Sequence, residues 1–69
     1  MREYILSVSS YANSPHHYLE VQWRDQPGDS WQHSAPLAYF TLQGAQRKRD
    51  KLQAHYERQG HKVTIGETT

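Results

Sequence analysis

The sequence predicts an α+β domain: a small, mostly antiparallel sheet with one helix packed on one face, in the order β-β-β-α-β. Two observations lead to this prediction. Apolar and polar residues alternate in residues 3–11 and 17–24, which is the two-residue period of a strand. Residues 41–60 instead favour a helix by composition and place apolar side chains on one helical face. A chain of 69 residues predicts a single domain, 1–69, with a frayed tail at about 66–69.

The first two predicted strands are separated by a turn at residues 12–15 (ANSP), where Asn, Ser and Pro disfavour regular pairing. Side chains alternate between the two faces of a sheet along each strand. The predicted inward positions of both strands are apolar or aromatic: Tyr4, Leu6, Val8, Leu19, Val21 and Trp23. These six side chains are the predicted core of the sheet.

A third strand is predicted after the clearest turn signal in the chain, residues 25–29 (DQPGD). Proline presets φ in such a turn and glycine supplies a positive φ. Residues 30–34 then return as a strand, with Trp31 expected to meet Trp23 across the hairpin. Pro36 limits this strand or marks it as an edge strand, since proline lacks the N–H that a ladder needs.

The helix is predicted between an N-cap at Thr41 and a C-terminal Gly60 that can adopt positive φ. Residues 37–40 (LAYF) are expected to lead into it and to pack under it. The apolar side of the helix consists of Ala45, Leu52 and Tyr56. Arg49 falls on this same side. It is read either as an arginine whose stem covers apolar surface, or as a buried arginine paired with a carboxylate such as Glu20 or with a partner.

The last strand is predicted around Val63 and Ile65, directly after the helix. A right-handed crossover places it parallel to the first strand and beside it. With the predicted strands numbered in chain order, the sheet order becomes 4-1-2-3. One face is covered by the helix, and the other is left to solvent or to a partner.

Charge is distributed unevenly although the net charge is only +1. Residues 43–62 contain six Lys or Arg and two acids, a net of +4, and the remainder of the chain has a net of −3. The predicted basic helix stripe consists of Arg47, Lys51 and Arg58, helped by Lys48 and Lys62. Such a stripe binds phosphates in nucleic-acid-binding proteins, or is simply a solvated helix face. The pI of about 8.1 lies below the values typical of nucleic-acid-binding modules.

Aromatic residues supply a second candidate surface on the open face of the sheet. Its predicted members are Tyr11, Tyr18, Trp31 and Tyr39, because one helix cannot cover all of them. An exposed aromatic set of this kind suits protein contact or self-association, and it can also stack on unpaired bases.

The sequence contains no pattern that indicates catalysis, so we expect that the protein is not an enzyme and uses no cofactor. It lacks cysteine, a nucleophile motif and a phosphate-binding glycine loop. The spacing of the five histidines puts no two of them on one helical face for a shared metal ion, and we expect no metal site. These are His16, His17, His33, His55 and His61.

No secretory segment and no membrane-spanning run is visible, which leads us to expect a cytoplasmic protein that does not enter membranes. The low mean hydropathy of −1.02 implies a small core, and forming a homodimer is an ordinary way to bury more surface. The sequence therefore predicts a small non-enzymatic accessory regulator that acts by docking to another protein. The alternative is a nucleic-acid-binding protein that uses the basic helix stripe.

Overall fold

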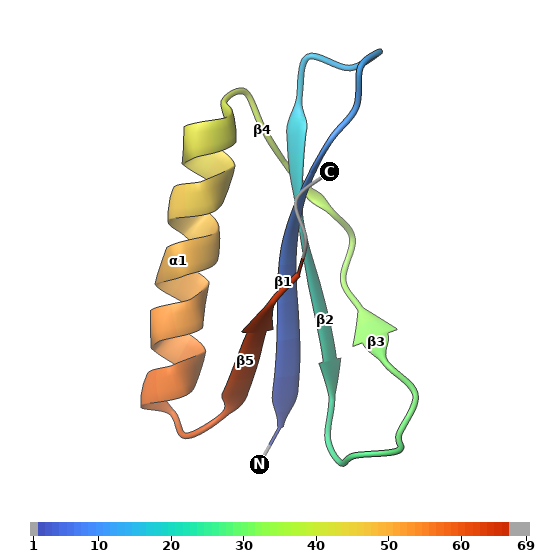
Figure 1. The fold of residues 1–69 in the computed structure, drawn as a ribbon, viewed down its shortest axis with the longest axis vertical. Helices are drawn as coiled ribbons and strands as arrows, with labels where there is room; N and C mark the ends of the chain where they lie inside the picture. The colour runs from blue at the N-terminus through green and yellow to red at the C-terminus, as the bar shows by residue number, and fades with distance from the viewer. Residues whose placement is uncertain (1, 67–69) are drawn as a thin grey trace.

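A computed structural model describes residues 2–66 and confirms the α+β class. One helix lies along one face of a mostly antiparallel sheet, as Figure 1 shows. In chain order the elements are β1 (Glu3–Ser10), β2 (His17–Arg24), β3 (Gln32–His33), β4 (Leu37–Tyr39), α1 (Leu42–Arg58) and β5 (Lys62–Ile65).

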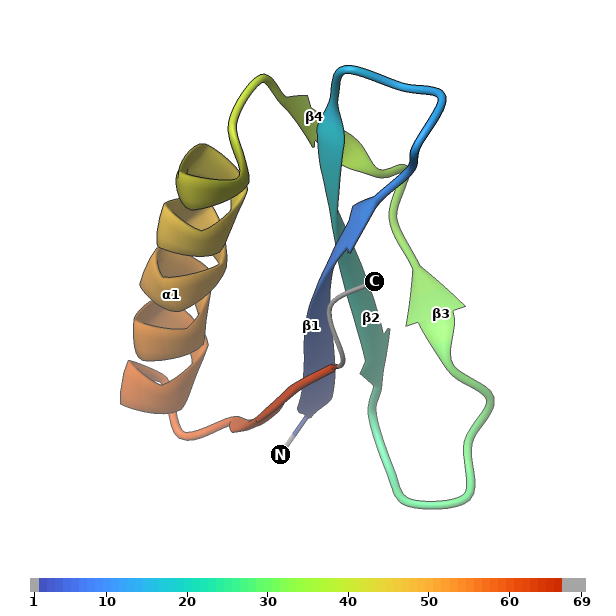
Figure 2. The same cartoon turned by 45° about the horizontal axis from the view of Figure 1, so that its top comes forward.

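The centre of the sheet is the antiparallel pair β1–β2, in a register that sets Leu6 opposite Val21. β5 returns from α1 and pairs with β1 in parallel, with Ile65 beside Leu6. The sheet order β3-β2-β1-β5 is the order predicted from a right-handed crossover. Figure 1 shows β5 beside β1, and in Figure 2 the chain runs from the lower end of α1 toward β1.

The outer edge of β2 differs from the prediction. The third strand was expected over residues 30–34 but is reduced to the two residues of β3. Residues 37–39 were expected to pack under the helix but form the extra strand β4, which pairs with the first half of β2. Pro36 lies between β3 and β4, and because proline cannot donate to a ladder it divides this edge in two.

The expected contact between Trp31 and Trp23 is wrong. Trp23 lies opposite Gln32 in the ladder and packs on the core cluster beneath α1, whereas Trp31 stacks on the guanidinium of Arg24. The turn itself is as predicted: the Asp29 N–H donates to the Gln26 carbonyl at 3.1 Å, and Gly28 has φ of 93°. These values are those of a type II turn, which requires positive φ at its third residue.

Both predicted ends of the helix are confirmed. The Thr41 hydroxyl oxygen accepts a hydrogen bond from the Gly44 N–H at 3.0 Å, and this satisfies one of the free donors of the first turn. At the other end Gly60 has φ of 88°, and its N–H donates to the Glu57 carbonyl.

We therefore expect Thr41→Ala to lower the free energy of unfolding by about 1 kcal/mol, because the N–H of Gly44 loses its acceptor. Urea unfolding followed by circular dichroism measures this change. Thr41→Ser is the matched control and should stay near the parent protein, since serine keeps the hydroxyl. Equal stability of the alanine and serine variants would contradict the capping role.

The core lies between α1 and the helix-facing side of β1 and β2. Its buried side chains are Tyr4, Leu6, Val8, Leu19, Val21 and Ala45. All five strand members were predicted to face inward. Leu52 packs against both halves of this core, so the middle of the helix is held at its apolar face.

Arg49 pairs with a carboxylate of its own helix, not with one of the sheet. Its side chain is 18% exposed, and its guanidinium contacts the carboxylate of the adjacent Asp50 at 3.2 Å. The alternative pairing with Glu20 does not occur, because Glu20 belongs to the face of β2 that points away from α1.

The predicted frayed tail begins at Gly66, whose N–H donates to the Leu6 carbonyl at 2.7 Å. Residues 67–69 of that prediction lie outside the described residues.

Residues 37–40 were expected to pack under α1, but three of the four are exposed. Leu37 is 45% exposed and Phe40 is 81% exposed. Only Tyr39 of this segment packs beneath the helix, against the cluster of Val8, Leu19 and Ala45. Within residues 2–66 no helix is long and apolar enough to cross a bilayer.

Candidate functional site

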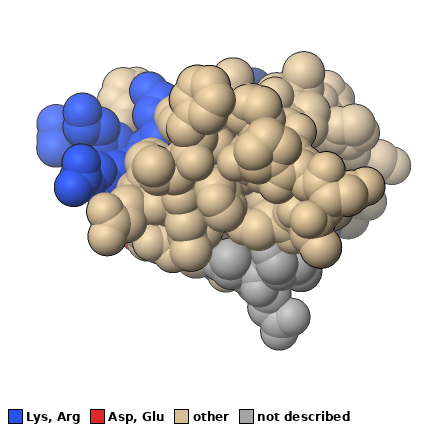
Figure 3. Space-filling model, turned by 90° about the horizontal axis from the view of Figure 1, so that it is seen from above, with Lys and Arg blue, Asp and Glu red and all other residues tan. Residues whose placement is uncertain are grey.

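The cations of the predicted basic helix stripe are exposed on α1. This holds for Arg47, Lys48, Lys51 and Arg58. Seen from above, Lys and Arg side chains gather on the helix side of the molecule, and the rest of this view is almost free of charge (Figure 3). Among residues 2–66, ion pairs form at Arg2, Arg24 and Arg49, but none forms at a member of the stripe.

Lys62 does not belong with the other four cations. It is exposed, but it lies opposite Glu3 in the β1–β5 ladder and alternates with Val63, which packs on the helix-facing core. Because successive side chains of a strand point to opposite faces, Lys62 belongs to the open face of the sheet. The stripe is therefore a feature of α1 alone.

The predicted aromatic face is also divided. Tyr11 and Tyr18 contact each other on the open side, with ring centroids 5.8 Å apart. Trp31 lies on the same side, where it stacks on Arg24 at 4.5 Å. Tyr39 was assigned to this face, and the assignment is wrong, because β4 turns its ring toward α1 and the buried Val8.

A further site, which the sequence did not indicate, is a groove of about 590 Å³ between α1 and the outer edge of β2. We call it the helix–sheet groove. Val21, Trp23 and Leu37 line its sheet side, and Lys48, Leu52 and Tyr56 line its helix side. It stays open because β3 is short and the chain from Ser34 to Leu37 does not close over the helix. Pro36 indicated that the strand beside β2 is limited, but no groove was predicted from it.

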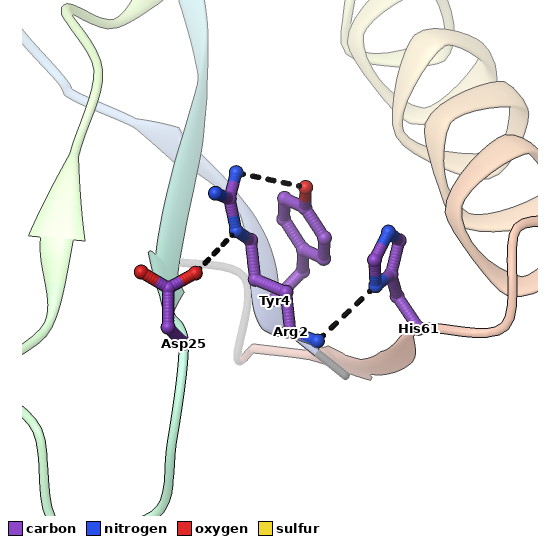
Figure 4. A network of polar contacts seen from close by, with 4 residues as sticks. All are labelled: Arg2, Tyr4, Asp25 and His61. Atoms are coloured by element: carbon purple, nitrogen blue, oxygen red, sulfur yellow. Dashed lines mark hydrogen bonds and ion pairs between the residues drawn. The ribbon is translucent and has the colours of Figure 1, made fainter.

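Two stacked tyrosines form the end of this groove that lies nearest the C-terminus of α1. The rings of Tyr4 and Tyr56 lie 3.8 Å apart and are parallel to within 3°. Figure 4 shows Arg2 beside Tyr4: the Arg2 guanidinium lies between the Tyr4 hydroxyl, at 3.5 Å, and the Asp25 carboxylate, at 2.9 Å. The backbone N–H of Arg2 donates to Nδ1 of His61 at 3.2 Å. These contacts link the first residues of the chain to the end of β2 and to the segment after α1.

Burial and hydrogen bonding at this end of the groove raise two pKa values. Burial raises the pKa of the Tyr56 phenol and neighbouring Tyr4 raises it further, while the Arg2 guanidinium acts in the opposite direction. Hydrogen bonds to Tyr4 and then to Asp25 raise the pKa of the Arg2 guanidinium, so Arg2 keeps its charge throughout the physiological range.

We expect the protein to lose stability as the pH rises above the ordinary tyrosine pKa of 10.0. Tyr56 keeps its proton to higher pH in the folded chain than in the unfolded chain, so the free energy of unfolding falls with rising pH in this window. Below the unfolded pKa the contribution is complete. Urea unfolding across this alkaline range measures how steeply the free energy of unfolding falls with pH. For each protein the fall is taken relative to its own stability near neutral pH, and it should be smaller in Tyr56→Phe than in the parent protein. An unchanged slope in Tyr56→Phe would contradict the assignment.

The described residues contain no group of three His, Cys, Asp or Glu side chains placed to hold a metal ion. His17 contacts the Ser10 hydroxyl at 2.6 Å, while His16 packs on Phe40. His61 belongs to the Arg2 network.

Comparison of the chain with protein-family models, with curated proteins and with solved structures finds no match. The functional argument therefore depends on the surfaces of this chain.

Proposed function

We propose that this chain is a small non-enzymatic interaction protein that binds another protein through the helix–sheet groove. The observation that supports the proposal most is the juxtaposition of an aromatic groove with unpaired lysines. Trp23 and Tyr56 line opposite sides of the groove, and Lys48 lines it on the helix side. Tryptophan and tyrosine are enriched among the residues that contribute most to binding at protein interfaces.

The dimensions of the groove suit a side-chain anchor of a partner. A volume of about 590 Å³ lies within the range of ligand sites and accommodates one or two large apolar side chains. The walls are already held in place, because Leu52 and Tyr56 also pack on the core. Binding of a partner therefore costs little conformational entropy on this side of the interface, because these side chains are already ordered.

The charge beside the groove identifies the partner chemistry that fits. With about 100° between successive helical residues, Lys48 precedes Leu52 by one turn on the groove side, and Lys51 follows on the adjacent flank. Neither lysine forms an ion pair with a carboxylate among residues 2–66. The expected partner is an acidic segment that places an aromatic or leucine side chain in the groove and carboxylates beside these lysines.

A display library of random peptides, selected on the purified protein, tests this proposal. We expect enrichment of peptides with an aromatic or leucine anchor flanked by Asp or Glu, and micromolar dissociation constants by fluorescence anisotropy. Lys48→Glu with Lys51→Glu should weaken the selected peptides by about tenfold or more, because like charges then face each other. Leu37→Asp, at an exposed position of the groove wall, should weaken them as well.

Arg47→Glu with Arg58→Glu is the matched control, since it makes the same charge change on α1 at two exposed positions that do not line the groove. It should change peptide affinity by less than about threefold. Selection of peptides without acidic residues, or equal losses in the control and in the Lys48/Lys51 variant, would contradict the proposal.

The second candidate function is nucleic-acid binding, and the unpaired, exposed cations of α1 favour it. Retention on heparin and on random duplex, measured at about 0.05 M and 0.3 M salt, distinguishes it from protein binding. Tight, steeply salt-dependent retention that Arg47→Glu, Lys51→Glu and Arg58→Glu together abolish would replace the docking proposal.

Two further parts of our proposal are a cytoplasmic location and self-association into a homodimer. Light scattering tests the homodimer, and a strict monomer would contradict it.

A further inference from the structure

A second hollow lies on the open face of the sheet, on the side away from the helix–sheet groove. It has a volume of about 350 Å³, and its walls come from the turn after β1, from β2 and from Pro36. We call it the open-face pocket. Its lining residues are Tyr11, Asn13, Ser14, Tyr18, Glu20 and Pro36.

Two tyrosine rings form adjoining walls of the open-face pocket. Tyr11 and Tyr18 are inclined at 56° to each other with centroids 5.8 Å apart, and both line the pocket. The Ser14 hydroxyl lies 3.3 Å from the Tyr18 hydroxyl, a contact that helps to position the Tyr18 ring. The Ser14 N–H donates to the Tyr11 carbonyl at 3.1 Å, which fixes the backbone of the turn beside Tyr11.

The third element of the open-face pocket is a carboxylate without a counterion. Glu20 lies two residues after Tyr18 on the same face of β2 and is partly buried. In the described part of the chain no Lys, Arg or His lies within ion-pair distance of Glu20, and no Lys or Arg stacks on either tyrosine ring. Aromatic faces carry negative potential, so rings and carboxylate together favour a positive guest.

The same face already contains a filled version of this arrangement. The Arg24 guanidinium stacks on the ring of Trp31 at 4.5 Å and contacts the Glu3 carboxylate at 3.2 Å. There an aromatic ring and a carboxylate hold a cation supplied by the chain itself. At Tyr11, Tyr18 and Glu20 the ring and carboxylate components recur, but no Lys or Arg of residues 2–66 fills the place that Arg24 takes beside Trp31.

We propose that the open-face pocket binds an organic ammonium group, with the cation against the faces of Tyr11 and Tyr18 and its charge balanced by Glu20. An alkylated ammonium fits best, because its methyl groups contact the rings and it requires little hydration. This function is separate from partner binding in the helix–sheet groove, and each can fail without the other. The ammonium group comes either from a small molecule or from a methylated lysine of a protein.

Titration with choline, followed by two-dimensional NMR of the ¹⁵N-labelled protein, tests the proposal. We expect saturable shifts centred on residues 11–20. The uncharged isostere 3,3-dimethylbutan-1-ol has the same shape and should bind at least about fivefold more weakly, since it keeps the methyl contacts but loses the electrostatic attraction of a cation to the ring faces. A trimethyl-lysine peptide forms a second arm: tighter binding of the peptide than of choline assigns the cation to a protein, and the reverse assigns it to a small molecule.

Variants identify the residues responsible. Glu20→Gln keeps the shape of the pocket and should weaken choline by about threefold or more, while Tyr11→Leu should weaken it by about five- to thirtyfold. Tyr11→Phe keeps the ring and should bind choline like the parent protein, and so should Lys48→Glu in the helix–sheet groove. The NMR spectrum of each variant shows whether it is folded. Absence of saturable binding by both choline and the peptide, or equal binding of choline and the alcohol, would overturn the proposal.

Discussion

Replacing Leu6 with alanine is expected to lower the free energy of unfolding by about 3 kcal/mol, within the range of 2–5 kcal/mol for buried leucines. Leu6 is fully buried. Its strand is held on both sides, by Val21 of β2 and by Ile65 of β5, so the backbone cannot close the cavity that alanine leaves. Since a chain of this length has a total stability of only about 3–10 kcal/mol, the loss is a large part of it.

Thermal unfolding measures this change, and the midpoint of Leu6→Ala should fall by about 10–25 °C. Phe40→Ala is the control. It removes a larger side chain, but Phe40 is 81% exposed, and its loss should change stability by less than about 0.5 kcal/mol. A Leu6→Ala midpoint close to that of Phe40→Ala would show that the core is not centred on β1.

The parts of the fold that could be predicted are those determined by local signals that agree with one another. Alternation fixes β1 and β2 to within one residue, because a shift by one position would turn Leu6 and Leu19 toward water. Thr41 and Gly60 fix the helix for a similar reason: each residue type suits the backbone at its end. The position of β5 beside β1 then follows from the handedness of the crossover.

The outer edge of β2 could not be predicted, because its strands are too short to carry a pattern. Three residues of β4 do not establish a period, so nothing local shows that Tyr39 faces α1 while Leu37 lies at the edge of a groove. The groove exists only because this edge is incomplete. The helical period predicts the outward position of the basic stripe on α1, but no local pattern places Trp23 across from Tyr56.

Replacing Tyr4 with alanine is the second large effect, with an expected loss of about 3–5 kcal/mol. Tyr4 is 8% exposed, and its ring is stacked on Tyr56 over nearly its whole face. Tyr4→Phe keeps the ring and removes only a long contact, 3.5 Å, with Arg2, so it should cost less than about 0.5 kcal/mol. Urea unfolding of both variants separates the contribution of the ring from that of the hydroxyl.

A double-mutant cycle then measures the stack directly. Tyr4→Leu and Tyr56→Leu, separately and together, should give a coupling free energy of about 0.5–1.5 kcal/mol, and strict additivity would contradict the stacking contribution. The cycle also bears on binding, because both rings line the helix–sheet groove. Tyr4→Phe leaves that wall intact and should bind the selected acidic peptides like the parent protein. Tyr56→Leu removes an aromatic wall, so a folded Tyr56→Leu variant that still binds the peptides fully would place their anchor elsewhere on the molecule.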